Sequence, residues 1–314
     1  MKAGSAILEP TAHVAIIGMG RSGSTFLEGR IAETFGGVAV GELPGVWGAF
    51  RNEQRLCACS LAPGDCPFWS GVLRRYQGLA RSETLDFMCG MNKRMLPIRN
   101  CYSWPLRAAV ARRALSADLN CYLQEMRALY EALGHTAREA GYQILVDSSK
   151  HPFWYQLAAQ GGALAPFAPR QTIRIVRHPA AVFYSLRRPG DEMTAGGRGQ
   201  IQRSYGLHQA VPYWLVMNLF GDRVAGNASI RVRYEDLADE RYLSELVRTG
   251  LKCSASARSH STFSHQLVGN PSRQGVTPTT FRLDTRWKDQ KRSASEKLSW
   301  RLLRRVLRKY GYTQ

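Results

Sequence analysis

The stretch HVAIIGMGRSGSTFLEGRIAETF, residues 13–35, decides the fold of this chain. An apolar, β-branched run ends in a glycine-rich turn and an amphipathic segment follows, which predicts a strand, a loop and a helix. Gly18, Gly20 and Gly23 permit positive φ angles, so consecutive N–H groups can point at one anion beside the helix N-terminus. Arg21 adds a planar cation suited to oxyanions. The hydroxyl donors of the same turn are Ser22, Ser24 and Thr25. The loop is therefore predicted to bind a phosphate-like group.

Three kinds of nucleotide site fit this loop. Its glycines match GxGxxG, and Glu42 lies where the ribose-binding acid of a Rossmann dinucleotide site would fall. They also match the frame of a P-loop, although Ser24 replaces the lysine that an ordinary ATPase uses. The third alternative keeps the P-loop backbone and moves the positive charge to Arg21. In that respect RSGST resembles the loop of sulfotransferases that use 3′-phosphoadenosine 5′-phosphosulfate (PAPS). The loop alone does not choose among them.

A second motif, QTIRIVRHPAAVFYSLRR at 171–188, favours the third alternative. It predicts a buried strand that ends at Arg177 and runs through Pro179 into a helix carrying Ser185. Open α/β sheets bind ligands at the carboxyl ends of their strands. The motif resembles the 3′-phosphate site of PAPS-dependent sulfotransferases, in which an Arg at a strand end and a Ser eight residues later hold that phosphate. Arg188 is a further candidate on the same helix.

Further segments extend this resemblance over most of the chain. ILVDSSKHPFW (144–154) is similar to the strand and loop that present a lysine in tyrosylprotein and carbohydrate sulfotransferases, and IRVRYEDL (230–237) to their late strand. HQLVGNPSR (265–273) and KYGY (309–312) resemble bacterial relatives of the carbohydrate enzymes. The resemblance implies PAPS as co-substrate and adds three donor-binding candidates, which are Tyr234, Ser272 and Arg273.

Sulfuryl transfer between two oxygens sets the demands on the remaining residues. The protein must stabilise the departing phosphate and accept a proton from the acceptor hydroxyl. Arg21 and the loop amides are predicted to do the first, with Lys150 approaching the bridging oxygen. Glu42 is the predicted base, because tyrosylprotein sulfotransferases have a glutamate at a similar distance after the loop arginine. His151 and His178 are rival bases, since cytosolic small-molecule sulfotransferases use histidine.

Composition limits the class of partner. The 314 residues can bury a sizeable core, and the nucleotide motifs are spread along them, so one elaborated α/β domain with a P-loop-type parallel sheet flanked by helices is expected over 1–314. The formal net charge of +19 favours anionic partners, and the acceptor, a hydroxyl of a carbohydrate, glycolipid or secondary metabolite, can itself be anionic. No nucleic-acid-binding motif accompanies the charge. The alternatives are an ATP-dependent P-loop kinase and a non-catalytic module that binds polyanions.

The cysteines and the N-terminal residues bear on compartment and metal. The first 18 residues hold too short an apolar run for a signal peptide, and no run approaches a membrane span, so a cytoplasmic protein is expected. Cys57, Cys59 and Cys66 are the only clustered cysteines among seven. Because the sequence offers them no clear fourth ligand, reduced thiols or one local disulfide are favoured over zinc, and no metal is predicted.

The hydrophobic pattern places the remaining elements. Strands are expected near 13–17, 37–40, 144–147, 172–176 and 229–233. Helices are expected at 24–35, after Pro179, after Glu235, at 293–309 and within 105–140. Residues 41–70 are predicted to form an irregular insertion that contains the clustered cysteines. The glycine-rich segment 189–203 is predicted to be a mobile loop that borders the acceptor site.

Overall fold

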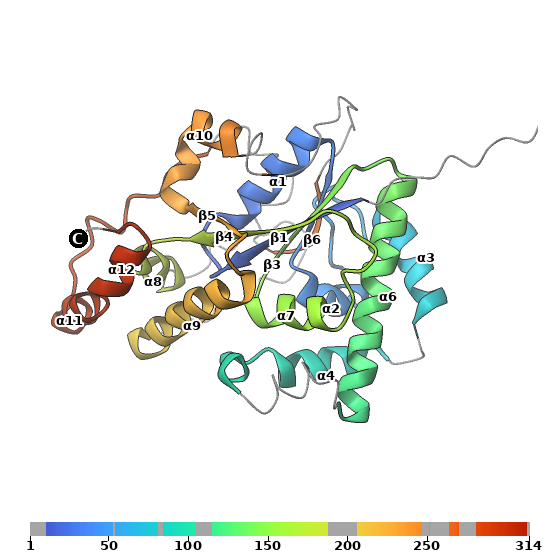
Figure 1. Ribbon diagram of the computed structural model, residues 1–314, viewed down its shortest axis with the longest axis horizontal. Helices are drawn as coiled ribbons and strands as arrows, with labels where there is room; N and C mark the ends of the chain where they lie inside the picture. The colour runs from blue at the N-terminus through green and yellow to red at the C-terminus, as the bar shows by residue number, and fades with distance from the viewer. Residues whose placement is uncertain are drawn as a thin grey trace, which may run out of the picture.

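A six-stranded parallel sheet forms the centre of the molecule (Figure 1). The structure is a computed structural model that describes residues 11–52, 54–80, 84–103, 115–187, 206–246, 251, 264–269 and 281–312. The strands are β1 (Ala12–Gly18), β2 (Val38–Gly41), β3 (Ile144–Lys150), β4 (Arg170–Val176), β5 (Ile230–Arg233) and β6 (Ser264–Val268). Their order across the sheet is β5-β4-β1-β3-β2-β6.

Helices cover both faces of the sheet. On one face lie α1 (Ser24–Phe35) and α10 (Glu240–Glu245), and on the other lie α6 (Ala117–Glu139), α7 (Pro152–Gln160) and α9 (Leu207–Ala225) (Figure 1). The other helices are α2 (Val46–Phe50), α3 (Trp69–Leu79), α4 (Leu85–Met95), α8 (Pro179–Arg187), α11 (Ala294–Leu302) and α12 (Arg304–Lys309). Single 3₁₀ turns occupy Leu43–Gly45, Ile98–Tyr102 and Tyr234–Ala238.

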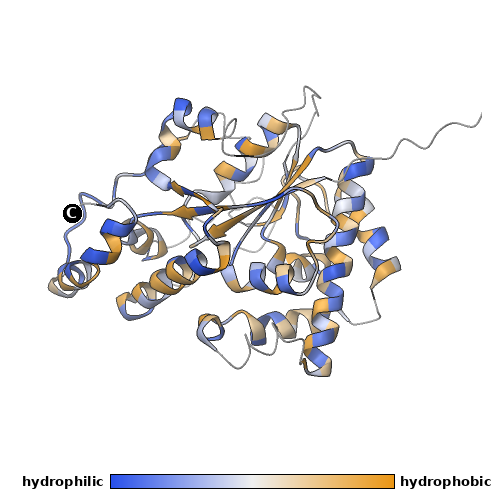
Figure 2. Cartoon of the chain, in the orientation of Figure 1, coloured by the Kyte–Doolittle hydropathy of each residue, from blue (hydrophilic) through white to orange (hydrophobic). Residues whose placement is uncertain are grey.

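The central strands are largely apolar, as expected where helices cover both faces of a sheet. Every residue of β1 is buried, and Figure 2 shows hydrophobic residues along the central strands. Successive side chains of β3 pack into different cores: Ile144 and Val146 join the core beneath α1, whereas Leu145 joins the core formed with α6 and α7. Continuous apolar strands of this kind are typical of parallel sheets.

The strand order excludes one of the three kinds of nucleotide site that fit the loop. In the common Rossmann order β2 lies beside β1. Here β3 and β4 flank β1, and β2 lies beyond β3. The Rossmann alternative is therefore wrong for this chain, and the predicted α/β fold with a P-loop-type parallel sheet is confirmed. The carboxyl end of β1 is the switch point of the sheet, where ligands of open α/β folds bind.

Most of the predicted elements are present. The five predicted strands appear as β1 to β5, and the first helix has the predicted bounds 24–35. The predictions missed β6, and the helix predicted over 293–309 is divided into α11 and α12. The insertion at 41–70 is not wholly irregular, because α2 forms within it and packs against α4 and β6.

Other predictions concern residues that the structure does not describe. The helical pattern within 105–140 yields α6, while 104–114 and the predicted loop 189–203 lie outside the described residues. The division into domains stays a prediction. None of the helices in the described ranges combines the length and apolar character that a bilayer span requires.

Candidate functional site

Five parallel strands bring the predicted site residues to one edge of the sheet. The loop with Arg21 follows β1, Glu42 follows β2 and Lys150 ends β3, while Arg177 follows β4 and Tyr234 follows β5. Along this edge the residues follow the spatial order of the strands, from Tyr234 through Arg177 and the loop to Lys150 and Glu42. Residues up to 213 positions apart in the chain meet there because parallel strands all end on the same side.

Two glycines of the loop are required by close packing. A Cβ at Gly18 (φ 150°) would collide with the carbonyl oxygen of Ile175. A Cβ at Gly23 (φ 84°) would lie 2.8 Å from the Leu237 side chain and 2.9 Å from the Tyr234 ring. The prediction is wrong for Gly20. Its φ is not positive, and no atom lies within 4 Å of the position that a Cβ would take. The left-handed residue between them is Arg21 itself, at φ 68°.

Arg21 joins the two predicted nucleotide motifs. Its Nε donates a hydrogen bond of 2.9 Å to Ser185 Oγ on α8, 164 residues away. Arg177 Nη1 donates to the Arg21 carbonyl oxygen at 2.8 Å. A non-glycine residue in the left-handed region costs on the order of 1–3 kcal/mol, which surrounding contacts must offset. These two hydrogen bonds fix the loop to β4 and α8.

Arg177 is a buried cation, and one of its nitrogens has no hydrogen-bond partner among the described residues. It is 4% exposed and its guanidinium lies 3.8 Å from the centre of the Tyr234 ring. Its Nη2 is 3.6 Å from Asp284 Oδ2, while Nε has no hydrogen-bond partner among the described residues. Ser22 Oγ, in the neighbouring loop, is also buried without a partner there. Buried donors of this kind are normally satisfied, so they are open to a ligand that accepts hydrogen bonds.

Two further loop residues are placed by α1. Ser24 begins the helix and is 2% exposed, and the Thr25 carbonyl oxygen accepts a hydrogen bond of 3.3 Å from Gln266 Nε2. Three residues predicted to bind the nucleotide lie outside the described residues: Ser272, Arg273 and Arg188.

Glu42 and Lys150 form an ion pair at the other end of the edge. The Glu42 carboxylate is 31% exposed, whereas Lys150 is 10% exposed and has the left-handed φ of 62°. The turn that carries Glu42 is held on both sides. Its own N–H donates to the Val268 carbonyl oxygen at 2.9 Å, and the next N–H, of Leu43, donates to Ser149 Oγ at 3.2 Å. The chain thus holds a solvent-accessible carboxylate beside a largely buried ammonium group.

The sequence analysis missed two charged residues near Glu42. Burial lowers the pKa of Arg55, and the charge of Glu42 opposes that shift, so Arg55 is a second cation close enough to affect this carboxylate. Glu28 of α1 is fully buried, and burial raises its pKa to about 7. Nothing in the sequence signals either contact, since the residues lie 13 and 14 positions from Glu42 on different elements.

Glu28 supports the turn of Glu42 from below. Its two oxygens accept hydrogen bonds of 2.6 Å each from the Gly41 N–H, the Ser148 hydroxyl and Gln266 Nε2. One buried side chain therefore connects α1 with β2, β3 and β6. Because all three partners are donors, the carboxyl group acts as a structural junction close to the candidate base.

The rival bases lie in apolar surroundings. Burial lowers the pKa of both His151 and His178 to about 4. The His178 ring stacks on Trp287 at 4.6 Å, and its Nδ1 accepts the Ala180 N–H at 3.2 Å. Both ring nitrogens of His151 are buried, and a hydrogen bond with the Leu96 backbone only partly opposes the lowering of its pKa. His178 thus acts as a cap of α8, and both histidines favour the neutral form, whereas the Glu42 carboxylate is 31% exposed.

The three clustered cysteines have a fourth neighbour that the spacing did not predict. His265 of β6 lies beside Cys57, Cys59 and Cys66, and the four possible ligand atoms all lie within 4.8 Å of one another. The statement that this cluster lacks a clear fourth ligand is therefore wrong. The histidine was out of reach of sequence reasoning because 198 residues separate it from Cys66.

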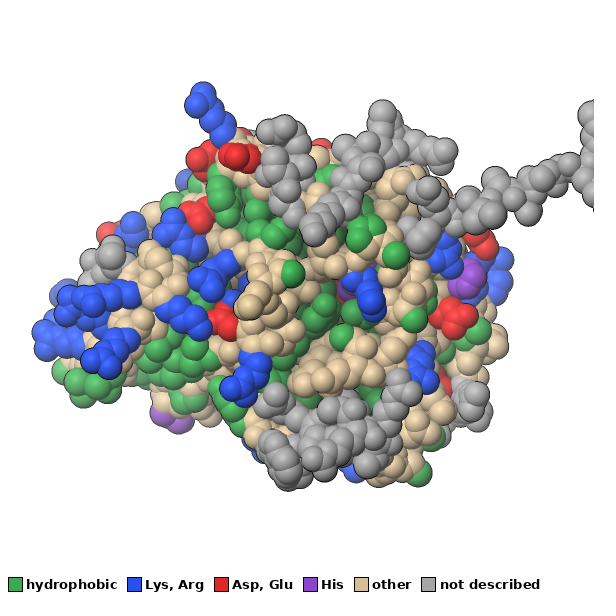
Figure 3. Space-filling model, in the orientation of Figure 1, with side chains coloured by type: hydrophobic (Ala, Val, Ile, Leu, Met, Phe, Trp, Pro, Cys, Tyr) green, Lys and Arg blue, Asp and Glu red, His purple; other side chains and the backbone are tan. Residues whose placement is uncertain are grey.

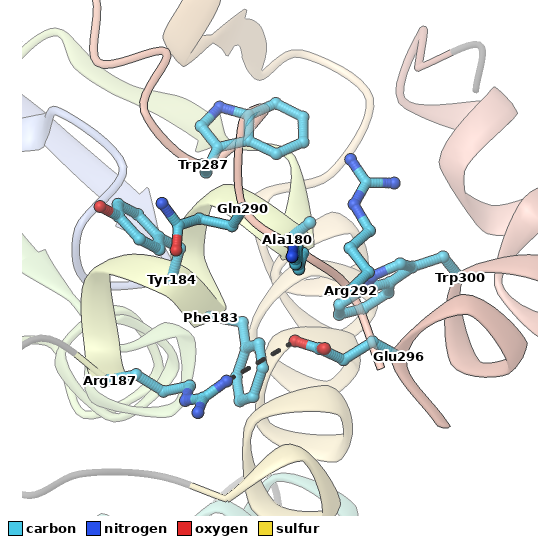
Figure 4. A pocket seen from close by; sticks show the side chains of 10 residues that line it. Ala180, Phe183, Tyr184, Arg187, Trp287, Gln290, Arg292, Glu296 and Trp300 are labelled. Carbon is cyan, nitrogen blue, oxygen red and sulfur yellow. Dashed lines mark ion pairs between the residues drawn. The ribbon is translucent and has the colours of Figure 1, made fainter. Parts of the chain in front are cut away.

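A basic end of the molecule and a pocket near it lie apart from the predicted site residues. Lys and Arg side chains gather at the end of the molecule formed by α11 and α12 (Figure 3). A pocket of about 360 Å³ opens nearby, between α8 and residues 287–300. In Figure 4, Trp287, Trp300 and Phe183 line it, with an ion pair of 3.8 Å between Arg187 and Glu296. None of the predicted site residues lines this pocket, and they lie at the strand edge instead.

Comparison with known proteins gives structural neighbours only. No family model and no curated protein matches the chain. The sulfotransferase domain from the Synechococcus PCC 7002 olefin synthase is similar over 98% of this chain and 96% of its own, with 18% identity and a TM-score of 0.45. The sulfotransferase domain from the curacin biosynthetic pathway is similar over 97% of this chain and 99% of its own, with 15% identity and a TM-score of 0.44.

Proposed function

We propose that the protein is a PAPS-dependent sulfotransferase that transfers a sulfuryl group to a hydroxyl of a carbohydrate, glycolipid or secondary metabolite. The observation that carries the proposal is the contact between the two nucleotide motifs: Arg21 bonds to Ser185, and Arg177 bonds to the Arg21 carbonyl oxygen. Two phosphate-binding patterns far apart in the sequence thus form one cationic surface at the switch point of the sheet. PAPS, with phosphates at both ends of its ribose, requires such a pair.

Each residue of the edge has a role in this proposal. Arg177, stacked on Tyr234, binds the 3′-phosphate together with Ser185. The loop from Ser22 to Thr25 surrounds the 5′-phosphate with amides and hydroxyls, and Arg21 stabilises the charge that develops on it when the sulfuryl group leaves. Ser272, Arg273 and Arg188 stay candidates for the donor on their sequence motifs alone.

Glu42 is proposed as the general base. It accepts the proton of the acceptor hydroxyl as that oxygen attacks sulfur in line with the departing phosphate. Lys150, paired with Glu42, orients the carboxylate and lies on the strand next to the loop, so it can also approach the bridging oxygen. The reaction, as proposed, needs no metal ion at this edge.

The ATP-dependent kinase alternative meets an obstacle at Asp147. P-loop NTPases hold Mg²⁺ with a loop hydroxyl and an acid on a neighbouring strand. Asp147 of β3 is 2% exposed, and its oxygens accept hydrogen bonds from the Tyr130 hydroxyl and the Ser149 N–H at 2.7 Å each. That carboxylate is committed to the core. A polyanion-binding module would account for the net charge, but not for the contacts between the loop and α8.

Calorimetric titrations test the proposal. Adenosine 3′,5′-bisphosphate should bind without Mg²⁺ and about 10–100-fold more tightly than AMP, because a charge-assisted hydrogen bond contributes about 1.5–3 kcal/mol. ATP that binds more tightly than the bisphosphate, and only with Mg²⁺, would instead support the kinase. Tight binding of heparin with no preference between the two adenosine nucleotides would support the polyanion module.

A further inference from the structure

Three cysteines of the insertion and one histidine of the edge strand form a compact cluster away from the strand edge. The Cys59 and Cys66 sulfurs are 3.5 Å apart, and the Cys66 and Cys57 sulfurs are 3.7 Å apart. His265 Nδ1 lies 3.2 Å from Cys66 Sγ and 3.9 Å from Cys57 Sγ. Cys57, Cys66 and His265 are buried, and no disulfide joins the described cysteines.

These separations match the edges of a zinc-centred tetrahedron. Thiolate sulfurs about 2.3 Å from one tetrahedral zinc ion stand about 3.8 Å apart, and a sulfur and an imidazole nitrogen stand about 3.5 Å apart. The measured separations scatter around these values, and no pair of ligand atoms is further apart than 4.8 Å. Four ligands with no open position are typical of structural rather than catalytic zinc.

The backbone around the cluster holds the ligands in place. Ser60 adopts a left-handed φ of 67°, and its N–H donates to the Cys57 carbonyl oxygen at 2.9 Å, which closes the turn between the first two cysteines. Within that turn, the Ala58 N–H donates to the Gln266 carbonyl oxygen at 3.0 Å. The first pair of ligands is therefore bonded to β6 itself, beside the histidine.

The residues after Cys66 enclose the histidine. Phe68 stacks on the His265 ring with 5.5 Å between centroids and an angle of 21°. Trp69 Nε1 donates to the His265 carbonyl oxygen at 2.5 Å. The segment CPFW thus supplies one ligand and two contacts that orient another, which makes the cluster a built site rather than a chance gathering of thiols.

We propose that Cys57, Cys59, Cys66 and His265 bind one structural Zn²⁺ ion. Three thiols lose their protons to solvent as three Zn–S bonds form, His265 donates the lone pair of Nδ1, and no group is oxidised or reduced. Thiolate and imidazole ligands in a tetrahedral arrangement favour zinc over the oxygen-seeking Mg²⁺ and Ca²⁺.

The ion would fasten the outer strand of the sheet. In the described part of the chain, the only sheet partner of β6 is β2. Yet the Val268 carbonyl oxygen binds the N–H of Glu42, and Gln266 binds Glu28. By joining β6 to the insertion, zinc holds the strand that supports the turn of Glu42 while remaining outside the proposed reaction.

Metal analysis of the purified 314-residue chain tests the proposal. Wild type should carry one zinc ion per chain after gel filtration, whereas Cys57→Ser and Cys66→Ser should fall to background. Cys89→Ser and Cys121→Ser serve as matched controls and should keep zinc, since both cysteines lie outside the cluster. His265→Cys should retain the ion and His265→Ala should lose it, while His135→Ala, at an exposed position of α6, should have no effect.

Two measurements on the wild-type chain need no variant, so misfolding of a variant leaves the proposal testable. Native mass spectrometry should show the mass of the chain plus zinc less the released protons. Chain produced in cobalt-supplemented medium should show the intense visible bands of tetrahedral thiolate-bound Co²⁺. A chain two hydrogens lighter would reveal a disulfide, and a metal-free chain whose cluster thiols all react with iodoacetamide would reveal simple thiols. Either result overturns the zinc site, and neither depends on nucleotide binding or turnover.

Discussion

The two sides of the strand edge differ in which charged group is accessible. Beside β4, Arg177 and Arg286 share the carboxylate of Asp284, which lies 3.6 Å from the first and 2.7 Å from the second. Beside β2 and β3, Lys150 pairs with Glu42, and Arg55 is a second cation nearby. The Glu42 carboxylate is 31% exposed, against 17% for Asp284, while Arg177 Nε has no partner among the described residues. An anion is bound by cationic donors that are still without a partner, whereas a proton needs an oriented carboxylate that solvent or substrate can reach. This difference supports donor binding on the first side and acceptor activation on the second.

The largest expected effect separates these two roles. Glu42→Gln should lower turnover by roughly 10²–10⁴-fold, because it removes the base, and should leave the affinity for adenosine 3′,5′-bisphosphate within about threefold of wild type. Single-turnover rates and calorimetry measure the two quantities. Asp86→Asn, which changes an exposed acid paired with Arg51, is the control. Full activity in Glu42→Gln, with loss in His151→Ala or His178→Ala, would move the base to a histidine.

The loop arginine lies between the two sides and should affect both. Arg21→Ala should lower turnover by about 10²–10³-fold, because charge on the departing phosphate loses its stabilisation, and should weaken donor binding as well. Arg21→Lys should restore only part of each, since a point charge cannot replace the planar fork. Arg30→Ala, which removes a half-buried arginine of α1 that pairs with Glu33 and Glu240, is the matched control. Near-normal turnover in Arg21→Ala would remove the sulfuryl group from this loop.

A change on the β4 side should affect the preference between nucleotides most. Arg177→Ala should weaken adenosine 3′,5′-bisphosphate by about 10–100-fold and AMP less, because only the first has a 3′-phosphate, whereas both use the loop that Arg177 helps to hold. Arg170→Ala, at the opposite and exposed end of the same strand, provides the control. If both nucleotides lost affinity equally, Arg177 would support the loop rather than recognise the 3′-phosphate.

The smallest effect on turnover is expected at Glu28, beneath the β2 side. Its folded-state pKa of about 7 is above the ordinary 4.5, so folding takes up a proton between these values. The free energy of unfolding should therefore fall as pH rises from about 4.5 to 7, by at most about 3 kcal/mol.

The substitution Glu28→Gln should remove that dependence while leaving donor affinity unchanged. Thermal unfolding of both proteins at several pH values measures it, with Glu33→Gln on the exposed side of α1 as control. A wild-type chain whose stability rises over this window relative to Glu28→Gln would show that Glu28 is ionised throughout.

Local patterns in the sequence determined the strands and the loop that follow them. Five strands and the first helix were predictable because buried parallel strands are continuous apolar runs and because glycine turns mark their ends. The same logic placed Arg21, Glu42 and Arg177 at strand ends, while the resemblance of their segments to sulfotransferases added Lys150 and Tyr234 as candidates. Since parallel strands share one direction, a position at a strand end brings all five to one edge.

Contacts between distant segments were decided only by the tertiary structure. The fourth ligand of the cysteine cluster, the pairing of Lys150 with Glu42 and the junction at Glu28 each join elements far apart in the chain. They depend on the strand order, which places β2 between β3 and β6. A sequence pattern records which residues lie on one element, but the partner of a buried polar side chain follows from which elements pack together.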